Sequence, residues 1–202
     1  MNTTDICNMA LSSIGQGRIV SLTEDSETAR QCAIYYDLLR KSLLDTFHWG
    51  FAERSKKLAE VNAEMPGWDH VYAVPSDCRI VRQIYNRNER LETSEFTKEH
   101  AYHQFKISLV DESTKVVMVN MEEAWMDYTA DVKNAEMFNP HFCEALAHKL
   151  AYYLAMPLSG SQSIKQTEYQ LYQASIQQAM LSSAIENHHK IQWSQKYFDA
   201  RR

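Results

Sequence analysis

The spacing of hydrophobic residues changes twice along the chain, and this change limits the folds open to it. Near both ends, hydrophobic residues recur every three or four positions, which is typical of amphipathic α-helices. Between about residues 51 and 132 they alternate with polar residues or form short β-branched runs, which is typical of strands. The sequence therefore predicts an α+β fold, mainly α. In it, a helical bundle formed by the N- and C-terminal helices carries a central antiparallel β-rich insertion.

Four helices are predicted in the terminal segments, at about 3–15, 26–48, 140–156 and 162–188. In the second helix, Arg40 is predicted to lie off the buried stripe. That stripe consists of Cys32, Tyr36, Leu39, Leu43 and Phe47. The third helix is predicted to bury Phe142, Leu146, Leu150, Tyr153 and Leu154. The last helix is predicted to bury Tyr169, Tyr172, Ile176, Ala179, Met180 and Ser183.

The middle segment contains four stretches that favour strands over helices. "FAERSKKLAEV" is ambiguous but favours a strand, and Pro75 in "HVYAVPSDCRIVRQIYN" indicates an edge or a bend. "HQFKISLVDESTKVVMVNM" is typical of a hairpin with "DEST" as its turn, in which Phe105, Ile107 and Leu109 alternate with polar residues. "AWMDYTADV" predicts a further strand. We therefore expect a helical domain at 1–50 and 133–189, a β-rich insertion at 51–132 and a C-terminal arm at 190–202.

Composition excludes several classes of protein. The chain has 202 residues and a net charge of −5, with no run of lysine and arginine, which argues against sequence-independent binding of nucleic acid. No stretch approaches the ~20 apolar residues of a membrane span, so no membrane partner is expected. The four cysteines are far apart, which predicts reduced thiols in a protein folded in the cytoplasm.

The segment "HFCEALAH", at residues 141–148, has the most side chains that could ligate a metal. His141 and His148 are seven residues apart, which is about 10.5 Å along a helix, too far for both rings to reach one zinc ion. The zinc-protease pattern H-E-x-x-H is also missing. We therefore interpret the segment as the polar flank of a packing helix and expect no metal.

Other catalytic patterns are missing from the sequence as well. G-x-S-x-G, S-x-x-K and the phosphate-binding loop do not occur. Acidic pairs such as Asp111–Glu112 and Glu122–Glu123 are more typical of solvated turns than of a catalytic cleft. We expect no catalytic residues, no cofactor and no enzymatic activity.

Four stretches resemble one protein family. They are "ICNMALSSIGQGRIVSL", "TARQCAIYYDLLRKSLLDTFHWGFAERSKKLA", "VYAVPSDCRIVRQI" and "FNPHFCEALAHKLAYYLAMPLSGS". Together they resemble the tail tubular protein A family, the head-to-tail adaptors of short-tailed bacteriophages and related prophages. The last stretch is the most specific in order and spacing. The middle of the chain, from about residue 87 to 124, resembles the family mainly in the character of its residues.

The resemblance implies a structural virion protein in the phage tail, made and assembled in the host cytoplasm. In this family a homo-oligomeric ring, typically of twelve copies, lies under the portal protein. A tail nozzle of the tail tubular protein B type docks below the ring, and DNA passes through it without sequence-specific binding. The net negative charge of the chain suits such a channel, because repulsion between an acidic wall and DNA keeps the DNA mobile. The alternative is a tail-associated hydrolase of glycans or peptidoglycan, which would need two carboxyl groups flanking a groove.

The last thirteen residues, "KIQWSQKYFDARR", lose the helical period but hold three aromatic and four basic residues. Tryptophan, tyrosine and arginine are enriched at interface hot spots. We therefore predict that residues 190–202 dock on the portal protein. The docking residues would be Trp193, Tyr197, Phe198, Arg201 and Arg202. The alternative is that this tail packs back on its own subunit.

Overall fold

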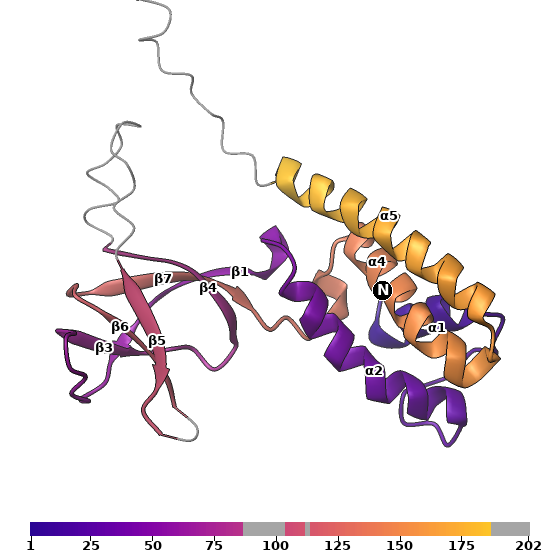
Figure 1. Ribbon diagram of the computed structural model, residues 1–202, viewed down its shortest axis with the longest axis horizontal. Coiled ribbons are helices and arrows are strands. Elements are labelled where there is room, and N and C mark those ends of the chain that lie inside the picture. Colours follow the sequence, from indigo (N-terminus) through magenta and orange to yellow (C-terminus); the bar gives the residue numbers. More distant parts are fainter. Residues whose placement is uncertain (87–103, 112–113, 187–202) are drawn as a thin grey trace, which may run out of the picture. The chain divides into compact units, whose positions relative to one another are not determined.

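The computed structural model describes residues 1–86, 104–111 and 114–186. Its chain forms two compact units, a helical unit from Met1–Ala52 and the described residues after Ala130, and a sheet unit from the described residues between Glu53 and Ala130. Figure 1 shows the helices of the first unit and the strands of the second. Both sheets are antiparallel, and the α+β class predicted from the sequence is confirmed.

All four predicted helices are present in the helical unit. They are α1 (Thr3–Ser13), α2 (Glu27–Leu44), α4 (Pro140–Leu154) and α5 (Gln162–Glu186), with short helical turns η1 (Gly50–Ala52), η2 (Ala135–Met137) and η3 (Ala155–Ser159). α1 begins at a capping box in which Asn2 and Asp5 each accept from the other's backbone N–H, at 2.9 and 2.8 Å. It ends where Gly15 adopts a φ of 73° and Gln16 N–H bonds back to Leu11, a turn that favours glycine.

α4 is the central helix of this unit. It contacts α1, α2 and α5, and its buried residues occupy most of its circumference, leaving one flank partly exposed, as expected of a helix packed against several others. Asn139 caps it and Pro140 opens it, as predicted. The Phe142 ring also meets the rings of Trp49, Phe51 and Phe138 at centroid distances of 5.0, 5.0 and 4.9 Å. These contacts join the end of α2 to the start of α4.

Several predicted stripe positions are wrong. Tyr153 on α4 is 40% exposed. Tyr169 on α5 is 48% exposed, because the buried side of α5 is centred on Glu168, Ser175, Ile176, Ala179 and Ser183. Tyr172, Met180 and Phe47 are only half-buried. Arg40, which was predicted to lie off the buried stripe, is instead only 1% exposed and is part of the buried side of α2.

The sheet unit contains seven strands among the described residues, arranged as two sheets. The strands are β1 (Glu53–Lys57), β2 (Ala59–Glu60), β3 (His70–Ala73), β4 (Cys78–Asn86), β5 (Phe105–Leu109), β6 (Lys115–Val119) and β7 (Ala124–Ala130). One sheet has the order β1-β7-β4 and the other β2-β3-β6-β5. The chain passes from the first sheet to the second through the buried residue Leu58, which separates β1 from β2.

The predicted strands and the hairpin are present in the sheet unit. β5 pairs with β6 with Leu109 opposite Lys115, and Pro75 lies in the bend between β3 and β4. The predicted alternation on β5 does not produce burial, since Ile107 and Leu109 are 39% and 61% exposed. β5 is at the edge of its sheet, whereas the central strand β6 is buried along most of its length.

Candidate functional site

The outward side of α5 is the most unusual surface of the helical unit. From Tyr169 to Ile185 the helix has no Asp, Glu, Lys, Arg or His. Leu171, Leu181 and Ile185 are 42%, 66% and 74% exposed, and glutamine, serine and alanine occupy most positions between them. A solvent-facing helix is normally rich in charge, so this uncharged face is typical of a surface that contacts another protein.

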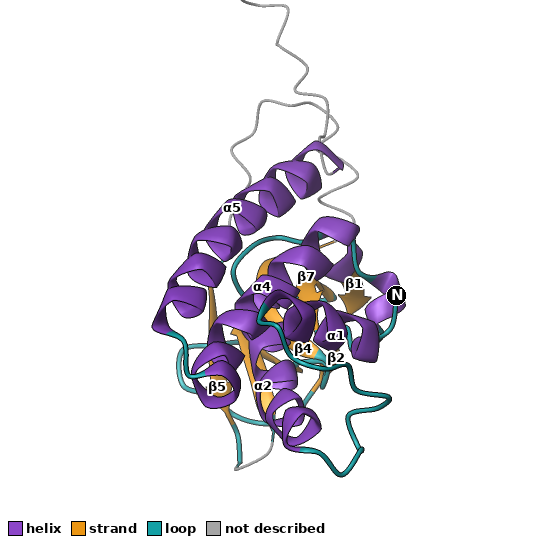
Figure 2. Cartoon of the chain, turned by 90° about the vertical axis from the view of Figure 1, so that its right-hand side faces the viewer, coloured by secondary structure: helices purple, strands orange, loops and turns teal. Residues whose placement is uncertain are grey.

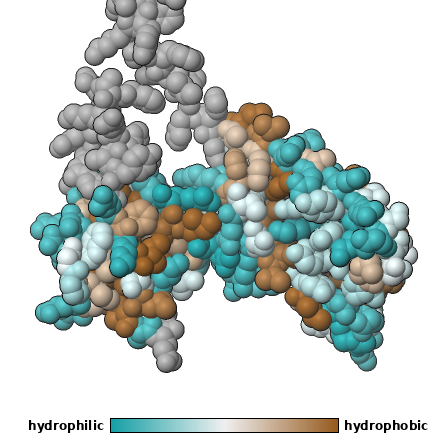
Figure 3. Space-filling view, viewed as in Figure 1, coloured by the Kyte–Doolittle hydropathy of each residue, from teal (hydrophilic) through white to brown (hydrophobic). Residues whose placement is uncertain are grey.

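A second apolar face lies on α2. Ile34 and Leu38 are both 62% exposed and are one helical turn apart, so they form one patch. Beside Ile34 is a shallow hollow of about 520 Å³, lined also by Leu22 and Ala33 and bordered by Asp25 and Arg30. Figures 1 and 2 place α2 and α5 on different sides of α4, so the unit carries two separate apolar faces. Figure 3 shows hydrophobic residues at the surface over α2 and over the C-terminal end of α5.

The inner side of α5 is held to α4 by polar contacts as well as by apolar packing. His148 Nδ1 lies 2.8 Å from Glu168 Oε2, and Glu168 is only 3% exposed. The neighbouring Lys149 donates to Ser42 Oγ at 2.9 Å and lies over the Tyr172 ring at 5.5 Å. Burial lowers the pKa of Lys149. These contacts fix which side of α5 faces inward and leave the uncharged side outward.

The buried Arg40 ties α2 to the segment that returns from the sheet unit. Its guanidinium donates to Asp37 and Asp131 at 2.6 Å each and to the Val132 carbonyl at 2.7 Å. Burial opposes the charge, but the hydrogen bonds and charges of Asp131 and Asp37 outweigh it and raise the pKa of Arg40. The sequence prediction missed this residue because its partner Asp131 is 91 positions away.

The residues of "HFCEALAH" separate into different surroundings. His141 lies 3.9 Å from Glu144 on the partly exposed flank, whereas His148 turns to Glu168 of α5. Cys143 is buried. Within the part of the chain that the structure describes, no group of three or more His, Cys, Asp or Glu residues is arranged to hold a metal ion.

Among the described residues, the carboxyl groups with shifted pKa values are all more acidic than usual. The pKa values of Glu27, Asp37 and Glu123 are all lowered, in each case chiefly by hydrogen bonds from neighbouring side chains. A general acid of a glycan hydrolase needs a raised pKa. Glu123, from one of the acidic pairs noted in the sequence, lies in the turn between β6 and β7 with a φ of 54° and pairs with Lys57 at 2.8 Å.

The residues predicted for portal docking lie outside the described residues. They are Trp193, Tyr197, Phe198, Arg201 and Arg202. Among the helices that are described, none has both the length and the apolar character needed to span a bilayer. A scan against protein-family models finds no match for this sequence, and a search among curated proteins finds none either.

Proposed function

We propose that this chain is a structural subunit of a head-to-tail adaptor ring in the tail of a short-tailed bacteriophage or prophage. The resemblance of four stretches to the tail tubular protein A family motivates the proposal. The two apolar faces of the helical unit support it. In the proposed architecture the helices form one bundle that builds the ring, and the sheets are an insertion in that bundle.

A ring constrains the surfaces of its subunits in a specific way. Each copy contacts two neighbours through two different surfaces, which must be complementary to one another. The helical unit offers one apolar face on α5 and another on α2, on different sides of α4. α5 has 25 residues, so its uncharged face extends along most of a helix of about 37 Å. We propose that the outward side of α5 packs on the Ile34–Leu38 side of α2 in the next copy.

The lack of charge on α5 suits contact between identical acidic chains. With a net charge of −5 per copy, assembly brings like charges together, and repulsion opposes it. An uncharged face buried between copies adds no desolvation cost for charged groups. On the α5 side, the contact therefore adds neither local repulsion between like charges nor the desolvation of a charged group.

The proposed partners follow from the ring. The portal protein would bind one side of the ring, with residues 190–202 as the docking arm, and a nozzle of the tail tubular protein B type would bind the other. Twelve copies would surround a channel through which DNA passes without sequence-specific contacts. The protein would be assembled on the head in the host cytoplasm and would remain in the virion as part of its tail.

The test mixes the purified chain with the portal of the same phage or prophage and images the mixture by electron microscopy. The wild-type chain is expected to form a ring on the portal. The double variant Leu181→Glu and Ile185→Glu should keep its helical circular dichroism but form no ring, because charge is placed in the contact between copies. Met137→Glu changes an apolar residue that is 55% exposed but lies on neither face, and this control should still form rings.

Two results would overturn the proposal. One is a failure of the wild-type chain to bind the portal, together with cleavage of peptidoglycan or glycan in a zymogram, which would favour the hydrolase. The other is ring formation by the α5 double variant at the wild-type level.

A further inference from the structure

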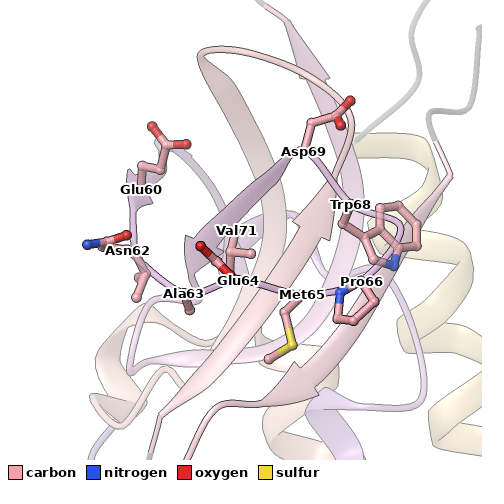
Figure 4. Close-up of a pocket in the computed structure, with 10 residues that line it drawn as sticks. Glu60, Asn62, Ala63, Glu64, Met65, Pro66, Trp68, Asp69 and Val71 are labelled. Carbon is pink, nitrogen blue, oxygen red and sulfur yellow. The ribbon is translucent and has the colours of Figure 1, made fainter.

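The sheet unit has a hollow that the proposed ring does not use. Its volume is about 750 Å³, and it is formed by the loop between β2 and β3 together with the adjoining strand residues. Figure 4 shows the loop curving from Glu60 and Asn62 at one end to Trp68 and Asp69 at the other. Met65 and Pro66 lie between these ends.

The hollow has a packed apolar floor. The loop residues Val61, Ala63, Met65 and Trp68 pack against a buried cluster of Val71, Val116 and Met118. Three backbone hydrogen bonds hold the loop in place, from Val61 to Val71 at 2.8 Å, from Ala63 to Val61 at 2.8 Å and from Trp68 to Met65 at 3.1 Å. The Asp69 N–H also donates to the Asn120 side chain at 2.9 Å. The loop therefore presents its side chains from a fixed backbone.

The charges around the hollow are of one sign. Among the described residues, its lining includes Glu60, Glu64 and Asp69 but no lysine, arginine or histidine. Just outside it, His70 Nδ1 lies 2.8 Å from Glu60. Carboxylates beside an indole ring suit a ligand that carries both cationic and aromatic groups. Cations pair with the carboxylates and lie over the ring face, while apolar groups fill the space above Met65 and Val61.

The chain itself contains a segment of this chemistry. Residues 190–202 include Lys190, Lys196, Arg201 and Arg202 with a single acidic residue, and Trp193, Tyr197 and Phe198 lie among them. This segment is basic in a chain whose net charge is −5, so it is attracted by the acidic remainder. We propose that the hollow between β2 and β3 is a binding site for residues 190–202 of this chain.

In the chain without a partner, residues 190–202 would therefore be bound in this hollow. It goes beyond the proposed ring, and it can be tested on the purified chain without a portal. If the ring proposal also holds, portal and hollow compete for the same arm.

Carbodiimide cross-linking of the full chain tests the site directly, because the reagent joins a lysine amine only to a carboxyl group in contact with it. Mass spectrometry of the digest is expected to find Lys190 or Lys196 joined mainly to Glu60, Glu64 or Asp69. In the variant Glu64→Gln and Asp69→Asn, the cross-link from the arm lysines to Glu60, whose carboxyl group is unchanged, should fall about tenfold, the size expected for the loss of two exposed ion pairs. Both positions are exposed, so the fold should be unaffected, which circular dichroism checks.

A matched variant, Glu122→Gln and Glu136→Gln, removes two exposed carboxylates outside the hollow and should leave the cross-links unchanged. The arm variant Arg201→Glu and Arg202→Glu should reduce them, as should high salt. Mixing isotope-labelled with unlabelled chains shows whether the arm comes from the same copy or a neighbour, and either result supports the site. Cross-links that spread evenly over the acidic residues, or that survive in the Glu64 and Asp69 variant, would overturn it.

Discussion

Arg40 shows how one buried charge can fasten two distant parts of the chain. Its side chain is 1% exposed, and its partners Asp37, Asp131 and Val132 satisfy it from two directions. A buried cation is tolerated only when it is paired in this way. Its position makes it a sensitive probe of the helical unit.

The change Arg40→Met should lower the free energy of unfolding by about 3 kcal/mol, because it leaves Asp131 without its partner in a largely buried place. Urea denaturation measures the effect. Arg30→Met is the matched control, since Arg30 is 56% exposed on the same helix and pairs with Asp25 and Glu27 in solvent. Its loss should be below about 1 kcal/mol. Equal losses in the free energy of unfolding for the two variants would show that the buried Arg40 contacts stabilise the fold no more than exposed ion pairs do.

The two histidines of "HFCEALAH" should differ in their effect on stability. His148→Ala removes the partner of Glu168, whose carboxylate is almost fully buried, and should cost about 1–3 kcal/mol. His141→Ala affects a partly exposed side chain 3.9 Å from Glu144 and should change stability by less than about 0.5 kcal/mol. Thermal unfolding of both variants compares them. A His141 loss as large as that of His148 would contradict the assignment of these two environments.

At the scale of elements, α4 determines how the helical unit packs. α4 contacts α1, α2 and α5, so its buried side chains form the centre of the core of this unit. Leu146→Ala should lower the free energy of unfolding by about 2–5 kcal/mol, since Leu146 is fully buried. Leu171→Ala is the control, because it removes the same atoms from an exposed position on α5. A cost near zero for Leu146→Ala would mean that α4 is not the centre of the core.

The sequence was sufficient to predict these elements but not their rotation or their neighbours. Helical spacing, the cap at Asn139 and the hairpin around β5 and β6 are local signals, and each is present in the structure. The inward side of α5 depends on which residues of α4 it meets. The buried pair of His148 and Glu168 turns Tyr169 outward, which periodicity alone could not show.

The candidate surfaces depend on similar long-range information. Ile107 and Leu109 follow the pattern of a buried strand face, yet they are exposed because β5 is at an edge. The hollow above Val71 exists because β6 packs beneath the loop between β2 and β3, and no spacing within that loop indicates it. The uncharged run from Tyr169 to Ile185 was visible in the sequence, but its meaning depended on which side of α5 faces outward.

At the scale of the whole molecule, the C-terminal arm should be separable from the fold. A chain that ends after His189 keeps all four helices and both sheets of the described residues, so its circular dichroism should match that of the full chain, and its melting temperature should fall only by the small contribution of the arm bound in the hollow. It should no longer bind the portal, because the aromatic and basic residues of the arm are gone. Co-sedimentation with purified portal measures this. Unfolding of the shortened chain, or undiminished binding to the portal, would refute the docking arm.

The order of the units along the chain has a consequence for how the protein is made. α1 and α2 are synthesised first, but the helix that buries them, α4, begins at Pro140, after the whole sheet unit has been translated. At ribosomal speeds of about 5–20 residues per second, the apolar sides of α1 and α2 wait roughly 5–20 seconds for their partner. During that interval the strands from β1 to β7 can pair with one another, since each of these described strands pairs only with others of the seven. We therefore expect the sheet unit to fold on the ribosome first, while the apolar sides of the first two helices stay uncovered until α4 emerges.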